Sequence, residues 1–149
     1  MTDATVVGAR HVSRWFDVGA DRIAAFADAT DDWNWIHTDP ARAAQSPFGG
    51  PVAHGFLTLS LLSAMAYDAL RMTGEGGNPS VNYGLDRVRF VAPVPAGSRL
   101  RAVFVLARLT EMQGGATLAF DVTMEREGAD TPVMVARWLV RNVVPEAAN

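Results

Sequence analysis

The 149-residue sequence contains no cysteine. Disulfides, thiolate metal sites and a thiolate nucleophile are therefore excluded. Lysine is also missing, so all 13 basic side chains are arginines. Because alanine, glycine and valine are abundant as well, we attribute this bias to GC-rich coding sequence and infer no function from it.

Runs of like charge and long apolar runs are missing too. The net charge is −3 without an acidic or basic cluster, which argues against binding to a nucleic-acid backbone. The longest apolar-rich stretch, Phe56 to Ala66, contains three hydroxyl side chains and is shorter than the ~18–20 residues of a membrane span. Met1 to Arg14 has no apolar run of the kind found in secretory signals. We therefore expect a cytoplasmic protein with no nucleic-acid or membrane partner.

Several motifs of cofactor-dependent enzymes do not occur. The absence of GxGxxG and GxxxxGK[ST] disfavours dinucleotide and P-loop nucleotide sites. His37 and His54 have carboxylates nearby, but their spacing is not typical of a metal site. Neither Ser60 nor Ser63 stands in a G-x-S-x-G elbow, which disfavours a Ser/His/Asp triad. We therefore expect neither a metal nor a cofactor.

The first half of the chain has helical signals. Val12 to Val18 favours an opening strand, and Asp21 is placed to cap a short helix that follows it. Asp39-Pro40 begins another short helix, with Asp as N-cap and Pro at the first helical position. From Gly55 to about Met72 the pattern predicts a helix that is apolar nearly all round, which other elements must cover.

The second half alternates with period 2, which indicates strands with one buried face. Such strands are predicted over Val81–Phe90, Leu100–Leu109, Ala116–Met124 and Met134–Val140. The length and the apolar content of 49% suit a single domain over 1–149. The chain is therefore predicted to be α+β, with a curved antiparallel five-stranded sheet wrapped around one long central helix.

Asp32 and His37 stand five residues apart between two predicted helices. A carboxylate and an imidazole that converge on one water can share its proton transfers. An Asx-turn beside a surface histidine would give the same spacing. Trp33 and Trp35 on the same segment either wall an apolar pocket or bury the loop against the domain.

His54-Gly55 opens the long apolar helix. The first N–H groups of a helix have no intrahelical partner and stabilise negative charge, and glycine lets a ligand approach the backbone. Gly55 could equally serve only a tight entry into the helix. Ser63, two turns further along, reads by itself as a small polar residue in a packed helix.

Three motifs in register resemble the MaoC-like (R)-specific 2-enoyl-CoA hydratases of the hotdog superfamily. The first is Thr30-Asp-Asp-Trp-Asn-Trp-Ile-His37, the second Phe48-Gly-Gly-Pro-Val-Ala-His-Gly55, and the third Val88-Arg-Phe-Val-Ala-Pro-Val-Pro-Ala-Gly97. By motif the resemblance spans about Asp21 to Leu109. It implies a single hotdog domain and a homodimer with its active sites near the subunit boundary.

The resemblance also implies roles for individual residues. Asp32 and His37 would be the catalytic pair that holds and activates water, and Gly55 would offer its N–H to the thioester oxygen. Asn34 would orient the loop or the histidine, and Ser63 would support the pair. The implied reaction is syn addition of water to a trans-2-enoyl thioester of CoA, with acyl-carrier-protein thioesters also compatible.

Two departures from the motif matter. Trp35 replaces its proline and Asp31 replaces the glycine before Asp32, as in the branch that includes nodulation protein N.

Two other functions are compatible with a hotdog domain. A non-catalytic acyl-thioester-binding hotdog subunit would not need Asp32 and His37, and both are present. A hotdog thioesterase would need an acidic residue near the start of the central helix, and Phe56 to Tyr67 contains none.

Overall fold

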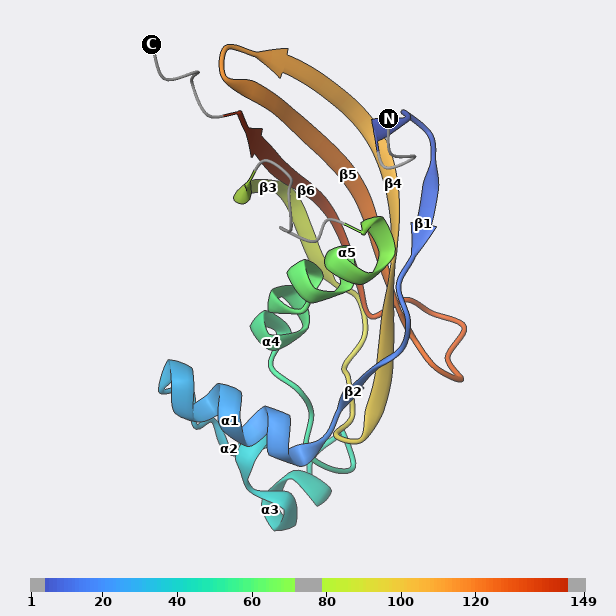
Figure 1. The fold of residues 1–149 in the computed structure, drawn as a ribbon. Helices are drawn as coiled ribbons and strands as arrows, with labels where there is room; N and C mark the ends of the chain where they lie inside the picture. The colour runs from blue at the N-terminus through green and yellow to red at the C-terminus, as the bar shows by residue number, and fades with distance from the viewer. Residues whose placement is uncertain (1–4, 72–78, 145–149) are drawn as a thin grey trace.

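The computed structural model describes residues 5–71 and 79–144, which form one antiparallel sheet curved around a helical segment (Figure 1). This α+β architecture confirms the predicted fold class. The strands are β1 (Arg10–Val12), β2 (Phe16–Val18), β3 (Ser80–Phe90), β4 (Ser98–Met112), β5 (Gly115–Arg126) and β6 (Met134–Val143). The helices are α1 (Ala20–Thr30), α2 (Trp35–Thr38), α3 (Pro40–Ala44), α4 (Gly55–Ser60) and α5 (Leu62–Leu70).

The sheet has the order β1-β4-β5-β6-β3, and β2 also pairs with β4. The four long strands lie where period-2 alternation predicted them. In β5 the even positions from Leu118 to Met124 are buried, while Asp121 between them is exposed. Alternation has this effect because successive side chains of a strand point to opposite faces of the sheet.

The apolar helix lies on the concave face of the sheet, and it is divided into α4 and α5 at Leu61 (Figure 1). Burial of apolar surface against the sheet is the main force that holds it there. Its buried side chains pack in one core with the inward faces of the strands. The fully buried members include Met65, Leu100, Leu106, Phe104, Phe120, Met124 and Met134.

Two predictions of local structure were wrong in detail, and a third is not tested. The opening strand is split into β1 and β2, so the sheet has six strands rather than five. Between them Ser13 turns inward, and its hydroxyl accepts a hydrogen bond from the Ala102 N–H. The side chain of Asp21 does not cap α1, whose N-cap is Gly19. The predicted helix end at Met72 lies outside the described residues.

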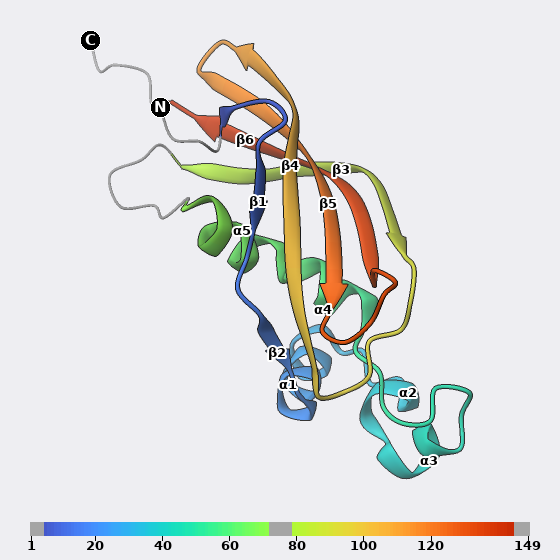
Figure 2. The ribbon, with the colours of Figure 1, turned by 90° about the vertical axis from the view of Figure 1, so that its right-hand side faces the viewer.

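Helices α1, α2 and α3 gather beside the first turn of α4, away from α5, in both ribbon views (Figures 1 and 2). The chain from 31 to 54 therefore lies at one end of the central helical segment. In the described part of the chain, no helix is long and apolar enough to cross a membrane.

Candidate active site

The segment with Asp32 begins where α1 ends. Asp31 adopts the left-handed conformation (φ 57°, ψ 25°) and closes the helix with its N–H on the Ala27 carbonyl. A left-handed residue is a common helix end because it turns the chain sharply. Asp32 follows directly with an exposed side chain, so the turn at Asp31 determines where its carboxylate stands.

His37 lies on a short helix, α2, where the sequence predicted only loop. The side chain of Asn34 caps this helix by accepting the Ile36 N–H (3.3 Å). The Asn34 carbonyl accepts the His37 N–H (2.9 Å). Asn34 thus fixes the backbone on which His37 stands. Asp39 caps α3 through the Arg42 N–H, with Pro40 at its start, which confirms that prediction.

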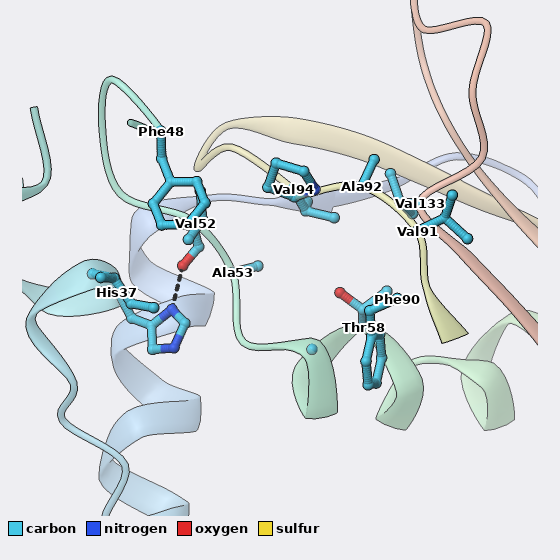
Figure 3. Close-up of a pocket in the computed structure, with 13 residues that line it drawn as sticks. His37, Phe48, Val52, Ala53, Thr58, Phe90, Val91, Ala92, Val94 and Val133 are labelled. Carbon is cyan, nitrogen blue, oxygen red and sulfur yellow. Dashed lines mark hydrogen bonds between the residues drawn. The ribbon is translucent and has the colours of Figure 1, made fainter. Parts of the chain in front are cut away.

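The imidazole of His37 is oriented by the main chain. Its Nδ1 lies 2.6 Å from the Val52 carbonyl oxygen (Figure 3). A carbonyl can only accept, so Nδ1 carries the hydrogen, and in the neutral ring Nε2 is left with a lone pair. The ring is half-buried. This arrangement fixes which nitrogen of His37 is free to exchange a proton with a bound molecule.

His54 is the residue of the site that sequence reasoning missed. It is 2% exposed, and its ring stacks on that of His37 with centroids 3.8 Å apart and 27° between the planes. Its Nε2 lies 2.9 Å from the backbone oxygen of Asp32. In the sequence, the one sign of His54 was the His-Gly pair before a helix. Its contacts join residues 17 or more positions apart, and such contacts leave no local sequence pattern.

Burial is the largest influence on the titration of His37 and lowers its pKa below the usual 6.5. The neighbouring His54 lowers this pKa further. The hydrogen bond to the Val52 carbonyl and the charge of Asp32 act in the opposite direction and are outweighed. His37 is therefore neutral at pH 7, with Nε2 able to accept a proton.

A pocket of about 270 Å³ opens beside His37 (Figure 3). Its wall is mostly apolar, with the imidazole, the Thr58 hydroxyl and backbone groups as polar elements. The lining residues are Ile36, His37, Phe48, Val52, Ala53, Gly55, Thr58, Phe90, Val91, Ala92, Pro93, Val94 and Val133. An apolar pocket with few polar groups is typical of a small-molecule site.

Gly55 lines this pocket as the first residue of α4. A Cβ at this position would lie 3.2 Å from three ring atoms of Phe90, so glycine permits the ring to approach the backbone. The N–H groups in the first turn of a helix lack intrahelical partners. Gly55 thus combines a backbone donor with close access to the pocket.

Ser63 lies in a second pocket of about 210 Å³, which shares no lining residue with the pocket at His37. Its hydroxyl accepts a hydrogen bond from the Asn82 amide (3.4 Å), and the Asn82 oxygen accepts the Trp138 indole N–H (3.1 Å). Within one chain, the structure therefore brings Asp32 and His37 together with His54 but does not bring Ser63 to them.

Neither tryptophan of the motif lines the pocket at His37. Trp33 is 55% exposed and does not bury the loop against the domain. Trp35 is half-buried, with the guanidinium of Arg42 4.2 Å from its ring centroid. Trp35, which stands where the motif has proline, thus packs against α3.

Asp32, His37 and His54 each place one potential metal-ligand atom within 4.8 Å of the others. The geometry does not favour a chelate. One nitrogen of each imidazole is engaged by a backbone carbonyl, and the lone pairs of two stacked rings point along nearly parallel planes rather than toward one ion.

A family model described as MaoC like domain matches residues 4–127. The chain belongs to the MaoC-like family. It is 48% identical over 130 residues to nodulation protein N of Rhizobium leguminosarum bv. viciae, covering 85% of this chain and 80% of the relative. It is 44% identical over 132 residues to 3-hydroxyacyl-thioester dehydratase Z of Mycobacterium tuberculosis, covering 88% and 86%.

The fold of this MaoC-like chain also matches a solved structure, the (R)-hydratase from A. caviae involved in PHA biosynthesis. The TM-score is 0.73 at 29% sequence identity, with 94% of this chain and 97% of the other covered. These matches confirm the resemblance to MaoC-like hydratases and the hotdog domain. The MaoC-like chain is a hydro-lyase of a hydratase and dehydratase family.

Proposed function

We propose that this protein reversibly adds water to trans-2-enoyl thioesters in the syn sense, giving (R)-3-hydroxyacyl thioesters. The observation that supports this best is the convergence of Asp32 and His37 beside an apolar pocket that also contains the first residue of α4. A water held by the carboxylate and by Nε2 of His37 would face a substrate in that pocket.

Asp32 and His37 would work as one acid–base unit. In hydration, the pair removes a proton from the bound water as its oxygen attacks C3, and a proton is delivered to C2. In dehydration the same groups act in reverse. The lowered pKa of His37 keeps the ring neutral at pH 7, which suits a base for water.

Negative charge develops on the thioester oxygen as the enolate forms. We propose that the N–H of Gly55 stabilises this oxygen, because it is a preorganised donor at the start of α4 in the same pocket. Asn34 would act indirectly, by capping α2 beneath His37. Ser63 would support the pair only from the second pocket, where Asn82 holds it.

The substrate would be an acyl-CoA, or the corresponding acyl-carrier-protein thioester, since both present the same enoyl thioester. No metal or further cofactor enters the proposal, because the acid–base pair and the backbone donor account for each charge that develops. Chelator treatment should therefore leave the rate unchanged.

We also propose a homodimer. Strand β3 is an edge of the sheet, paired only with β6 among the described strands. Apolar side chains along it are exposed, among them Val81, Tyr83 and Leu85. An exposed apolar edge strand is a liability that pairing across a two-fold axis removes. A monomeric mass by light scattering at micromolar concentration would contradict this.

The test of the activity is a crotonyl-CoA assay followed at the enoyl-thioester absorbance, with chiral analysis of the product. We expect loss of absorbance without added metal, and the (R) product. An (S) product, or dependence on a divalent ion, would contradict the mechanism. A folded protein that binds acyl-CoA without turnover would instead favour the non-catalytic subunit, and release of free CoA would favour a thioesterase.

A further inference from the structure

We infer that His54 is a positioning residue that holds Asp32 and the His37 ring in a fixed arrangement relative to each other. This inference rests on the proposed function, because it assigns a role within the same site. Its basis is that the His54 ring contacts both residues, Asp32 through a hydrogen bond and His37 through a stack.

The hydrogen bond fixes the position of Asp32. The Nε2 of His54 donates to the Asp32 backbone oxygen at 2.9 Å, because a carbonyl can only accept. Asp32 itself is exposed and directly follows the turn at Asp31, where few packing contacts would hold it. The buried His54, which precedes α4, therefore ties this turn to the start of the central helical segment.

The stack fixes the plane of His37. One face of the His54 ring lies against His37, and Phe26 of α1 is also in contact with the ring, with centroids 4.9 Å apart. The Val52 carbonyl holds His37 only at Nδ1. The plane of the ring could still tilt about this hydrogen bond unless a neighbouring group prevents it. His54 blocks this rotation and keeps Nε2 directed as the structure has it.

The remaining nitrogen of His54 supports an active-site role over ordinary packing. Its Nδ1 is buried, and no group in the described part of the chain hydrogen-bonds to it. A buried polar atom without a partner is unfavourable.

The stack also bears on the titration of His37. A positive charge on the His54 ring 3.8 Å away would disfavour a charge on His37, and this is one of the causes that lower the pKa of His37. The titratable groups that act on His37 are His54 and Asp32. Removing the His54 imidazole is therefore expected to raise the pKa of His37.

Two substitutions separate the hydrogen bond from the ring. H54Q retains an amide N–H close to the position of Nε2 but removes the imidazole, whereas H54F retains a flat ring but removes the donor. We expect H54F to lose about 10- to 100-fold in kcat, because small displacements of reacting groups have effects of that size. H54Q should recover most of this loss.

S13A, at a buried hydroxyl that accepts a hydrogen bond from the Ala102 N–H in β4, is a matched control for the loss of a buried polar contact.

The decisive measurement is imidazole nitrogen NMR, which needs no activity and is simple because the chain has three histidines. In the wild type we expect His37 to be protonated at Nδ1 and His54 at Nε2. The opposite tautomer of either residue would overturn the inference without any variant. The pKa of His37 should rise in both H54F and H54Q, because the His54 ring is one of the groups that lower it. An unchanged pKa of His37 in a folded variant would also overturn the inference.

The two proposals can fail separately. If the wild type does not hydrate crotonyl-CoA, the proposed function fails, and the inference is judged by the tautomers and the His37 titration alone. If the wild type is active but H54F keeps its kcat, or H54Q is as slow as H54F, the positioning role is wrong while the function stands.

Discussion

The two pockets along the α4–α5 segment differ in how their polar groups are satisfied. At Ser63, the hydroxyl, the Asn82 amide and the Trp138 indole bond to one another in a chain. At His37, backbone carbonyls engage one nitrogen of each imidazole, and His54 Nδ1 is unpartnered among the described residues. Polar groups that are mutually satisfied stabilise a fold, whereas groups with free capacity can act on a bound molecule.

The largest effect should come from the acid–base pair. General acid–base groups contribute roughly 10²–10⁴-fold each, so Asp32→Asn or His37→Ala should reduce turnover by about that factor. Residues that act as a unit are non-additive, and the double variant should be little slower than the slower single variant. The measurement is the set of turnover numbers with crotonyl-CoA.

Asp31→Asn is the matched control for Asp32→Asn. It removes an adjacent carboxylate, and asparagine tolerates the left-handed backbone found there. Turnover and melting temperature should stay near those of the wild type. The affinity of the Asp32 variant for a saturated acyl-CoA should change by less than roughly tenfold. If Asp32→Asn is folded and fully active, the pair is wrongly assigned.

The next effect is the pH dependence of the rate. It should report on the pocket at His37 alone, because the pocket at Ser63 has no histidine among its lining residues. Burial lowers the pKa of His37, so its neutral form persists below pH 6.5. Hydration should be constant across that value and then fall by about tenfold per pH unit below the lowered pKa. A kcat/KM profile that begins to fall above pH 6.5 would contradict this.

A smaller effect is expected at Gly55. A methyl group there would press on the Phe90 ring but would leave the backbone donor in place. We expect Gly55→Ala to lose up to about tenfold in kcat/KM, through displacement of the pocket wall. Gly50→Ala is the control, since a Cβ at that position would meet no atom within 4 Å. Equal losses in the two variants would argue against a specific role for Gly55.

The smallest effect is expected at Ser63. Ser63→Ala removes one hydrogen bond, the 3.4 Å contact that the Ser63 hydroxyl accepts from the Asn82 amide. Turnover should stay within about threefold of the wild type, because substitutions away from a site usually have small effects. A loss as large as that of Asp32→Asn would remove the contrast between the pockets. It would mean that a second subunit brings its Ser63 to the pair.

Much of the fold was predictable because its signals are local. Alternation in 116–124 determines which face of β5 is buried, and Asp39-Pro40 is a helix start wherever it occurs. The split of the opening strand was not predictable, since it depends on Ser13 bonding to Ala102 across the sheet. Asp32 and His37 were identifiable by motif, but the stack with His54 forms only when α4 folds beside α2.

The left-handed turn at Asp31 has a consequence for how this motif can change over time. For most side chains this conformation costs about 1–2 kcal/mol, and for aspartate less, because its short polar side chain can hydrogen-bond locally; glycine would relieve that strain. Glycine also gives the unfolded chain more freedom, which lowers stability by about 0.4–1 kcal/mol. These two opposing contributions are similar in size. Sequences can therefore exchange glycine and aspartate before Asp32 with little effect on stability, and this position is a poor marker of function in relatives.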